Sequence, residues 1–432
     1  MTQQVQPVPA CCSGKSSRRR FLRNSGLLAG AGVITSTIGT SFMQVARAST
    51  GVGTRLGTGG AGNVMLVLSM RGGADGLSMV VPWSDPAYEF ARPNLAIPAG
   101  TLLAKDSTFG LHPKFAPLLP MWNDGSFTAV NAVGLPVPNR SHFAAIEEIE
   151  DADPGSEERR GWLNRLVGLD AQESAVEAML IGSPIVTTSL YGSSPVLAVS
   201  NIDDMVLPGR KSDVAYERRV ASLTEAWSDD STALGRGAYA ALEMSEVFSD
   251  VAGSPGDPLH GAIYPKGDLG AALADAARLV RADIGAEVIT IDAGAWDMHV
   301  QVGTLDDGLM TKSIEELALG LAAFFTDLGA DASRVTVVTI SEFGRRVAEN
   351  ANNGLDHGWG NVMFLLGAGV IGGRYLGDRP GLGTGVLFDG DLPVTNDYRS
   401  VLAEVVATRF GADVSKVFPG FQPELIGAMS AA

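Results

Sequence analysis

The sequence predicts an α/β protein built on a mainly parallel sheet with helices on both faces. Short apolar runs that resemble strands alternate along the chain with segments of helical periodicity, which is the pattern of a parallel sheet with crossover helices. Several runs are apolar throughout, as expected where helices cover a strand on both faces. Polar residues follow some of these runs directly, and chemistry in such folds collects at the carboxyl ends of the strands.

The elements follow in order along a single predicted domain, residues 63–432. The predicted strands cover residues 64–68, 127–133, 288–291, 335–340 and 362–366. Helical periodicity marks residues 271–281 and 314–328, and a last helix is predicted from Asn396 and Asp397 to Phe410, with Gly411 as its C-cap. Residues 171–265 are less regular and rich in Pro, Gly and Ser, so we interpret them as an insertion or cap over the sheet.

The first 48 residues are predicted to be a cleavable twin-arginine signal peptide. The run SRRRFLR at 17–23 contains Arg18 and Arg19, a weakly apolar stretch follows to about residue 45, and Ala46-Arg47-Ala48 supplies the small residues of a cleavage site. A spanning helix would be more apolar, with fewer Gly and hydroxyl residues. We therefore expect export by the twin-arginine translocation machinery to the periplasm or the extracellular space. Residues 49–62, which are rich in Gly and Thr, are expected to be a flexible leader.

Removal of this signal changes the composition of the chain. Both cysteines, Cys11 and Cys12, lie in the signal, so no disulfide or thiolate can take part in the function of the mature protein. The signal also carries six basic and no acidic residues, and its loss changes the formal net charge from −16 to −22. Such a charge disfavours nucleic acid as a partner. No second long apolar run is present, so the mature protein is expected not to span a membrane.

Carboxylates and imidazoles gather at the predicted strand ends. Asp75 follows the first strand, Asp297 and His299 follow the strand at 288–291, and Glu342 follows the strand at 335–340 without a gap. His357 lies in the loop before the strand at 362–366. Oxygen and nitrogen donors without sulfur suit Zn, Mn or Fe, so these five residues are candidate metal ligands.

A further cluster contains a possible nucleophile. Ser141 and His142 precede a helix-like segment, and a helix N-terminus favours an anion or alkoxide. Ser is also among the best N-caps, and from this segment alone capping is the favoured interpretation of Ser141. His142 is a candidate general acid or a donor that supports the site, and it could equally cap its helix. Arg345 could hold a phosphate or sulfate, or it could pair with a carboxylate for structure alone.

The motifs GGADGL at 72–77, LHP at 111–113, RSHF at 140–143, DMH at 297–299, SEFGR at 341–345 and DHG at 356–358 together resemble the twin-arginine-exported family called domain of unknown function 1501. That family is similar in fold to the sulfatase and alkaline phosphatase superfamily. The resemblance covers nearly the whole mature chain.

The resemblance implies a site for divalent metal, Zn, Mn or Ca. One metal would be held by Asp297, His299 and His357, and a second by Asp75 and Ser141. The second site would also need an Asp-His pair, but Glu342 is followed by Phe343, so this site lacks its histidine. A formylglycine sulfatase is excluded, because no mature segment has Cys or Ser followed at the required spacing by Pro and Arg.

Two functions remain open at this point. The first is a metal-dependent hydrolase of phosphate or sulfate esters, acting on a small-molecule or polymer substrate with Ser141 as nucleophile and Arg345 neutralising transition-state charge. The second is a non-catalytic envelope binding or assembly protein with a degenerate metal site, since a fold does not fix a function.

Overall fold

The structure is a computed structural model. It describes residues 31–38, 41–48, 62–169, 176–205, 207, 213–228, parts of 242–252, and 256–430. The twin-arginine motif and nearly all of the predicted leader lie outside the described residues.

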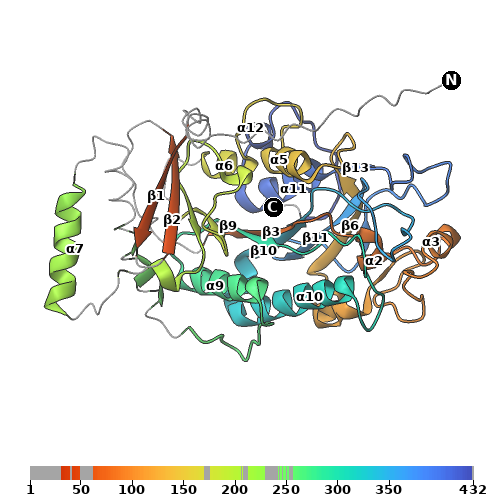
Figure 1. Cartoon of the computed structure of the whole chain (residues 1–432), viewed down its shortest axis with the longest axis horizontal. Helices are drawn as coiled ribbons and strands as arrows, with labels where there is room; N and C mark the ends of the chain where they lie inside the picture. Colours follow the sequence, from red (N-terminus) through yellow and green to blue (C-terminus); the bar gives the residue numbers. More distant parts are fainter. Residues whose placement is uncertain are drawn as a thin grey trace, which may run out of the picture.

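One large sheet forms the centre of the molecule, in the order β1-β2-β8-β7-β9-β3-β10-β11-β6-β12, with β13 also paired to β6 (Figure 1). Strands β8, β7, β9, β3 and β10 are parallel to one another, and β11 is antiparallel to both its neighbours. The strands of this sheet are β1 Ala31–Ile38, β2 Ser41–Ala48, β3 Val64–Met70, β6 Phe127–Gly134, β7 Ala178–Ile181, β8 Val196–Val199, β9 Val288–Ala293, β10 Val335–Ile340, β11 Asn361–Gly367, β12 Tyr375–Leu376 and β13 Asn396–Asp397. A two-stranded sheet pairs β4 Val80–Val81 with β5 Gly110–Leu111.

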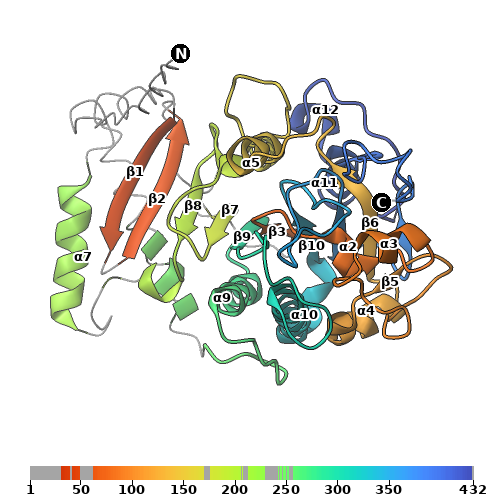
Figure 2. The same cartoon turned by 45° about the vertical axis from the view of Figure 1, so that its right-hand side comes forward.

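Helices pack on both faces of the large sheet, with α9 and α10 on the face opposite α5, α6 and α11 (Figure 1). Figure 2 shows α5 again on the other side of the sheet from α9 and α10. The helices are α2 Gly76–Met79, α3 Pro86–Ala91, α4 Leu119–Asn123, α5 His142–Asp151, α6 Trp162–Val167, α7 Val214–Ala226, α9 Asp268–Ala282, α10 Leu309–Leu328, α11 Tyr398–Phe410 and α12 Val414–Val417. Short 3₁₀ turns are η1 Pro113–Leu118, η2 Thr188–Leu190, η3 Asp203–Met205 and η4 Gly329–Arg334.

The central strand β3 is apolar at residues 64–68, and its packing shows why. Leu66 and Leu68 belong to the core under α9 and α10, whereas Met65 and Val67 belong to the core under α5, α6 and α11. Successive side chains of a strand point to opposite faces, so a strand covered on both sides buries apolar residues on both. This confirms the predicted α/β class and its mainly parallel sheet.

The strand ends that carry the polar residues are level with one another. Ile340 of β10 pairs with Ser69 of β3, and Met70 of β3 pairs with Ala293 of β9. Because β11 runs in the opposite direction, its first residue, Asn361, lies at the edge where β6 ends and pairs with Val133 near the end of β6. Loops from five parts of the chain therefore meet at one edge of the sheet.

The five predicted strands are confirmed to within two residues of the observed bounds. The last predicted helix is also confirmed: Asp397 caps α11 by accepting a hydrogen bond from the Arg399 N–H, and Gly411 ends it in the left-handed conformation. Residues 171–265 differ from the expected cap, because β7 and β8 within them belong to the main sheet. These strands have only four residues each between Pro-, Gly- and Ser-rich turns, which hides their pattern in the sequence.

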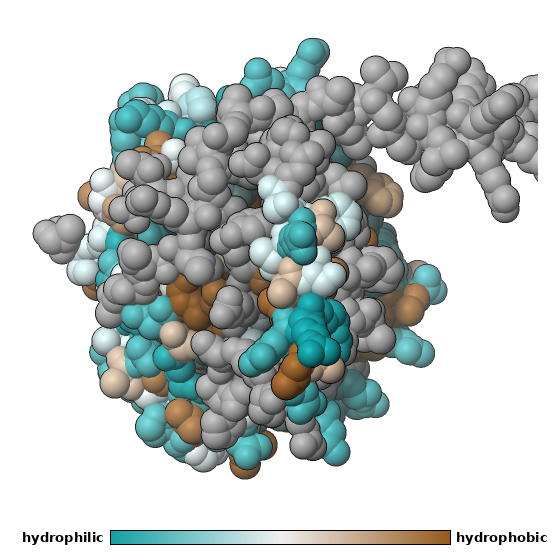
Figure 3. Space-filling view, turned by 90° about the vertical axis from the view of Figure 1, so that its left-hand side faces the viewer, coloured by the Kyte–Doolittle hydropathy of each residue, from teal (hydrophilic) through white to brown (hydrophobic). Residues whose placement is uncertain are grey.

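One end of the molecule is formed by β1, β2 and α7 (Figure 1). The strands β1 and β2 lie in the segment predicted to be a signal, and cleavage after Ala48 would remove both and leave β8 as the edge strand. The helix α7 buries none of its side chains, and hydrophilic and apolar residues are interspersed on this face (Figure 3). Within the described residues no helix has the length and apolarity that crossing a membrane requires.

Candidate metal centre

Four loops at the carboxyl edge of the sheet bring three histidines to one carboxylate, that of Asp297. Asp297 and His299 lie in the loop after β9, and His357 lies in the loop before β11. His142 is the first residue of α5, which follows β6. The loop after β10 adds Glu342, whose side chain is buried.

Close backbone contacts hold these loops together. The Leu355 N–H donates to the Met298 carbonyl at 3.0 Å, and the Asn350 amide donates to the His299 carbonyl at 3.0 Å. A Cβ at Gly354 would lie 1.8 Å from that same carbonyl oxygen, so only glycine allows this approach. The loops of His299 and His357 are thus fixed to each other by backbone contacts.

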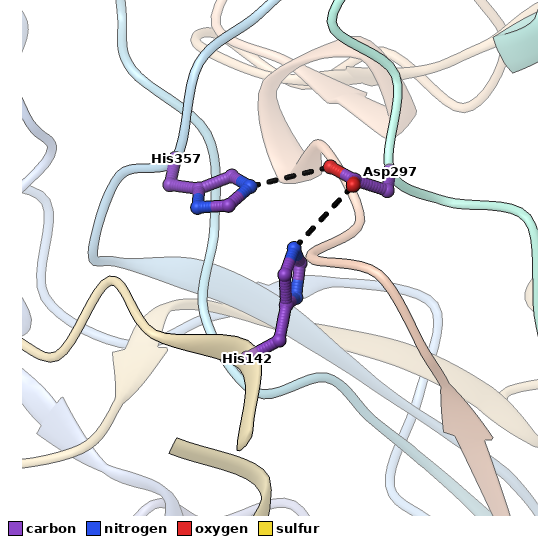
Figure 4. A group of neighbouring side chains, drawn as sticks. All are labelled: His142, Asp297 and His357. Atoms are coloured by element: carbon purple, nitrogen blue, oxygen red, sulfur yellow. Dashed lines mark hydrogen bonds and ion pairs between the residues drawn. The ribbon is translucent and has the colours of Figure 1, made fainter. Parts of the chain in front are cut away.

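The side chains of Asp297, His299 and His357 converge. Asp297 Oδ1 lies 3.1 Å from His299 Nε2 and 3.2 Å from His357 Nε2, and the two Nε2 atoms are 3.0 Å apart. His142 approaches the second carboxylate oxygen, with its Nε2 3.5 Å from Asp297 Oδ2 (Figure 4). Two sets of three donors therefore overlap, and Asp297 and His357 are common to both.

The outer ring nitrogen of each histidine is held by an oxygen. His299 Nδ1 lies 2.9 Å from Asp356 Oδ1, and His142 Nδ1 lies 2.7 Å from Glu342 Oε1. His357 Nδ1 lies 2.9 Å from the backbone carbonyl of Arg140. When Nδ1 donates to its oxygen, a neutral ring carries its lone pair on the Nε2 that faces Asp297.

This arrangement fits a cation. In that tautomer the Nε2 lone pairs of His299 and His357 would lie 3.0 Å apart next to a carboxylate oxygen, and a cation between them would relieve their repulsion. Nε2 of His142 is buried and has no hydrogen-bond partner among the described residues. Donor separations of 3.0–3.5 Å agree with a tetrahedral ion bound at about 2.0–2.2 Å from each ligand. His142, Asp297 and His357 together are a group that could hold a metal ion.

The ionisation of the group favours metal binding near neutral pH. Burial acts to raise the pKa of Asp297, but the hydrogen bond and charge of Arg345 outweigh it and lower this pKa to about 2. Burial lowers the pKa of His357 against the opposing effect of the Arg140 carbonyl, so this ring is more easily kept neutral. The hydrogen bond with His299 lowers the pKa of Asp356. Metal ligands need this ionised carboxylate and neutral imidazole.

Glu342, which was predicted to be a metal ligand itself, contacts the outer ring nitrogen of His142. Its Oε1 accepts from the His142 ring at 2.7 Å and from the Gly72 N–H at 2.8 Å, and its Oε2 accepts from the Ser341 hydroxyl at 3.2 Å. A carboxylate that orients a ligating histidine in this way is a common feature of metal sites.

Arg345 is buried and contacts Asp297 from the interior of the protein. Its guanidinium donates to the carbonyl oxygens of four residues and to Asp297 Oδ1 at 2.7 Å. The four carbonyls belong to Gly72, Gly73, Trp296 and Leu355. The structure therefore places Arg345 as a brace for Asp297 and the turn after β3, and these internal contacts use the groups that were expected to bind a substrate anion.

Asp75 is paired with an arginine. Arg92, from the end of α3, donates to Asp75 Oδ2 at 2.5 Å and to Oδ1 at 2.9 Å, and the Ser78 N–H donates to Oδ2 at 2.9 Å. Both side chains are almost completely buried. Both carboxylate oxygens are thus occupied by a fixed cation, so Asp75 does not join the histidines as a metal ligand.

Ser141 is exposed at the N-terminus of α5, immediately before His142. Within the described residues its hydroxyl makes no capping hydrogen bond; its N–H donates to Asn139 Oδ1 at 3.0 Å. The hydroxyl is therefore free of the capping role that its position suggests, and it lies beside a residue of the metal group.

A cavity of about 430 Å³ lies at the same edge of the sheet. Its lining includes Arg345 and Asp75 together with apolar residues such as Leu77 and Phe109. The histidines are not among its lining residues. Arg345 connects the cavity to the metal group, because it lines the cavity and also donates to Asp297.

Two residues of the site were not recognised as such from the sequence. For His142 as a metal ligand, the sequence offered one indication, its position next to Ser141 at a predicted helix start. Arg92 had none, because nothing near it in the chain indicates that it meets Asp75. His112 caps the start of η1 by accepting a hydrogen bond from the Lys114 N–H at 3.1 Å.

The fold and site together define an α/β protein with a His/Asp group at the carboxyl edge of its sheet that could bind a metal. The family described as "Protein of unknown function (DUF1501)" matches residues 122–390, more than half of the chain. The protein belongs to this family. The matched residues include all four donors of the metal group and exclude Asp75 and Arg92.

Among curated protein sequences, none matches the chain. One similar solved structure is the lipoteichoic acid synthase LtaP from Listeria monocytogenes, with 10% sequence identity and a TM-score of 0.32. The alignment covers 76% of this chain and 72% of that one. A similarity at this level carries no argument about function, which must come from the residues of this chain.

Proposed function

We propose that the protein is an exported, metal-dependent hydrolase of phosphate or sulfate esters with one principal metal ion. The observation that supports the proposal is the convergence of three imidazole Nε2 atoms on the ionised Asp297 carboxylate. A bound divalent cation at this place would polarise an ester oxygen and stabilise negative charge on it.

The residues of the chain divide the remaining tasks. Asp297, His142, His299 and His357 would hold the ion, while Glu342 and Arg345 fix the orientation of His142 and Asp297. Exposure of the group lets a large ester approach, since Asp297 has about half of its side-chain surface accessible, 48%. The identity of the ion would be Zn, Mn or Ca, of which Zn best fits a donor set rich in imidazole.

Ser141 is the proposed nucleophile. Its oxygen would form the bond to phosphorus or sulfur as the bond to the leaving alcohol oxygen breaks, and its proton would pass to water, to which the residue is exposed. Water would then cleave the seryl ester, release phosphate or sulfate and restore the hydroxyl. The N-terminus of α5 would favour negative charge at this oxygen.

A second candidate function is a non-catalytic envelope binding or assembly protein. The Asp75–Arg92 ion pair favours it, because a fixed guanidinium occupies the carboxylate that a second metal would need. The arginine that would neutralise a transition state is also occupied, by backbone carbonyls and Asp297.

One experiment separates the two. The exported protein is purified, loaded in turn with Zn²⁺, Mn²⁺ and Ca²⁺, and assayed against a panel of phosphate and sulfate mono- and diesters. A hydrolase gives turnover that Ser141→Ala abolishes while the bound metal remains. Absence of turnover with every metal and ester would refute the hydrolase and leave the binding protein.

A further inference from the structure

A buried carboxylate lies behind the metal group, on the loop that leads to β13. Asp391 has no exposed side-chain surface, 0%, and its Oδ2 accepts from Arg140 Nη2 at 2.5 Å and from Arg140 Nε at 2.9 Å. This two-pronged contact fixes the guanidinium in one plane. It therefore fixes the part of the chain that carries Arg140.

The backbone of Arg140 connects this contact to two metal ligands. Its carbonyl oxygen accepts from His357 Nδ1 at 2.9 Å, which leaves His357 Nε2 facing Asp297. His142 follows two residues later and opens α5. A shift of the Arg140 peptide would thus change the orientation of the His357 ring and the position of His142 together.

The third histidine is connected to the same place through Arg346. The Arg346 guanidinium lies 3.8 Å from Asp391 Oδ1 and 3.3 Å from Asp389 Oδ2. The backbone N–H of Arg346 donates to the Asp356 carbonyl at 2.9 Å, and the Asp356 carboxylate contacts His299 Nδ1. Asp391 therefore lies where the loops of all three histidines are anchored.

The position of Asp391 is itself fixed by its backbone. Its N–H donates to the Phe388 carbonyl at 2.9 Å, and its carbonyl accepts from the Phe388 N–H at 3.0 Å. The Val347 N–H also donates to the Gly390 carbonyl at 3.2 Å. The turn is closed on both sides, so the carboxylate acts as an anchor rather than as a mobile partner.

We propose that Asp391 is a positioning residue of the metal group, which acts through Arg140 to aim His357 and His142 at Asp297. The proposal rests on the metal centre proposed above. Partners beyond the ligands commonly change metal affinity by about 10- to 100-fold, although they do not contact the ion. Asp389 offers a matched control, because it binds the same Arg140 but has 67% of its side-chain surface exposed.

The test compares Asp391→Asn with Asp389→Asn in the full mature protein. Zn²⁺ affinity is measured by competition with a coloured chelator. We expect Asp391→Asn to weaken Zn²⁺ binding by about tenfold or more, and Asp389→Asn to leave it within about twofold, since exposed ion pairs contribute little. Wild-type affinity in Asp391→Asn would overturn the proposal.

A second readout needs no metal. Nitrogen NMR of the metal-free, ¹⁵N-histidine-labelled protein reports which nitrogen of His357 carries the proton. We expect the Nδ1–H form in the wild type and in Asp389→Asn, and a mixture of both forms in Asp391→Asn. An unchanged His357 signal in Asp391→Asn would contradict the positioning role, whether or not the wild type binds Zn²⁺. Absence of Zn²⁺ binding in the wild type would separately refute the metal centre.

Arg140→Lys provides a second variant if Asp391→Asn does not fold. It keeps the charge and the backbone carbonyl but removes the planar fork. The same loss of Zn²⁺ affinity and the same change at His357 are expected, and wild-type values for both would overturn the proposal.

Discussion

The Asp75–Arg92 pair decides whether Asp75 contributes to metal binding or to stability. Asp75→Ala would leave the Arg92 guanidinium buried without its carboxylate, in a place where neither side chain has more than 1% of its surface exposed. Removal of one partner of a buried ion pair costs about 3–5 kcal/mol in the free energy of unfolding. Three further contacts of Arg92, to Ser78 Oγ, the Val347 carbonyl and the Arg346 carbonyl, remain and place the expected cost near the lower value, about 3 kcal/mol.

Urea unfolding followed by tryptophan fluorescence measures this cost, and metal analysis of the same sample measures the ion content. We expect a lower unfolding midpoint in Asp75→Ala and an unchanged number of metal ions per chain. The double variant Asp75→Leu with Arg92→Met should recover much of the loss, because apolar side chains can replace a buried pair at little cost. Loss of a metal ion from Asp75→Ala, with the unfolding midpoint unchanged, would refute this interpretation of the pair.

Four other outcomes are expected. Ser141→Ala should lower ester turnover by at least about a hundredfold, the scale of one catalytic group, with metal content unchanged. His299→Ala should lower metal content and thermal stability together, because metal binding is coupled to folding, and a variant with wild-type metal content would contradict the ligand role. Changing both Arg18 and Arg19 to Lys should retain the precursor in the cytoplasm, whereas the wild type should be exported and begin at Ser49; fractionation followed by N-terminal sequencing checks both. Burial acts to raise the pKa of Asp75, but the charge and hydrogen bonds of Arg92 outweigh it, so this pKa is lower in the folded protein. The carboxylate therefore stabilises the fold above its unfolded pKa of about 3.9, and this stability is lost as the pH falls through the folded pKa. The acid unfolding curve of Asp75→Asn should lack this pH-dependent loss of stability.

The sequence predicted the sheet well because buried strands leave an unbroken apolar signal. The β10 strand, Val335–Ile340, was predicted at its observed bounds, since it consists only of Val, Ile and Thr, the β-branched residues that strands favour. The direction of β11 could not be predicted, because pairing depends on contacts with β10 and β6 that are far away in the chain. The strands β7 and β8 were missed, since four apolar residues between turns are as typical of a loop as of a buried strand.

Site residues that directly follow strands could be predicted from the sequence, but contacts with residues from separate helices could not. Asp297 and His299 could be placed at the carboxyl edge because they follow a strand of the predicted parallel sheet, and the family resemblance grouped them with His357. The pairing of Asp75 could not, since Arg92 reaches it from the end of a separate helix. The brace formed by Arg345 depends on four carbonyls from three loops, which no local pattern encodes.

The central claim is that one metal ion binds where Asp297 and the histidines converge. A crystal structure of the mature protein grown with Zn²⁺, with anomalous data collected on both sides of the zinc absorption edge, tests it directly. The account predicts one strong peak per chain within about 2.0–2.2 Å of His357 Nε2 and an Asp297 oxygen, with Asp75 still bound to Arg92. A protein without a peak at this group, or with its ion held by Asp75, would contradict the claim.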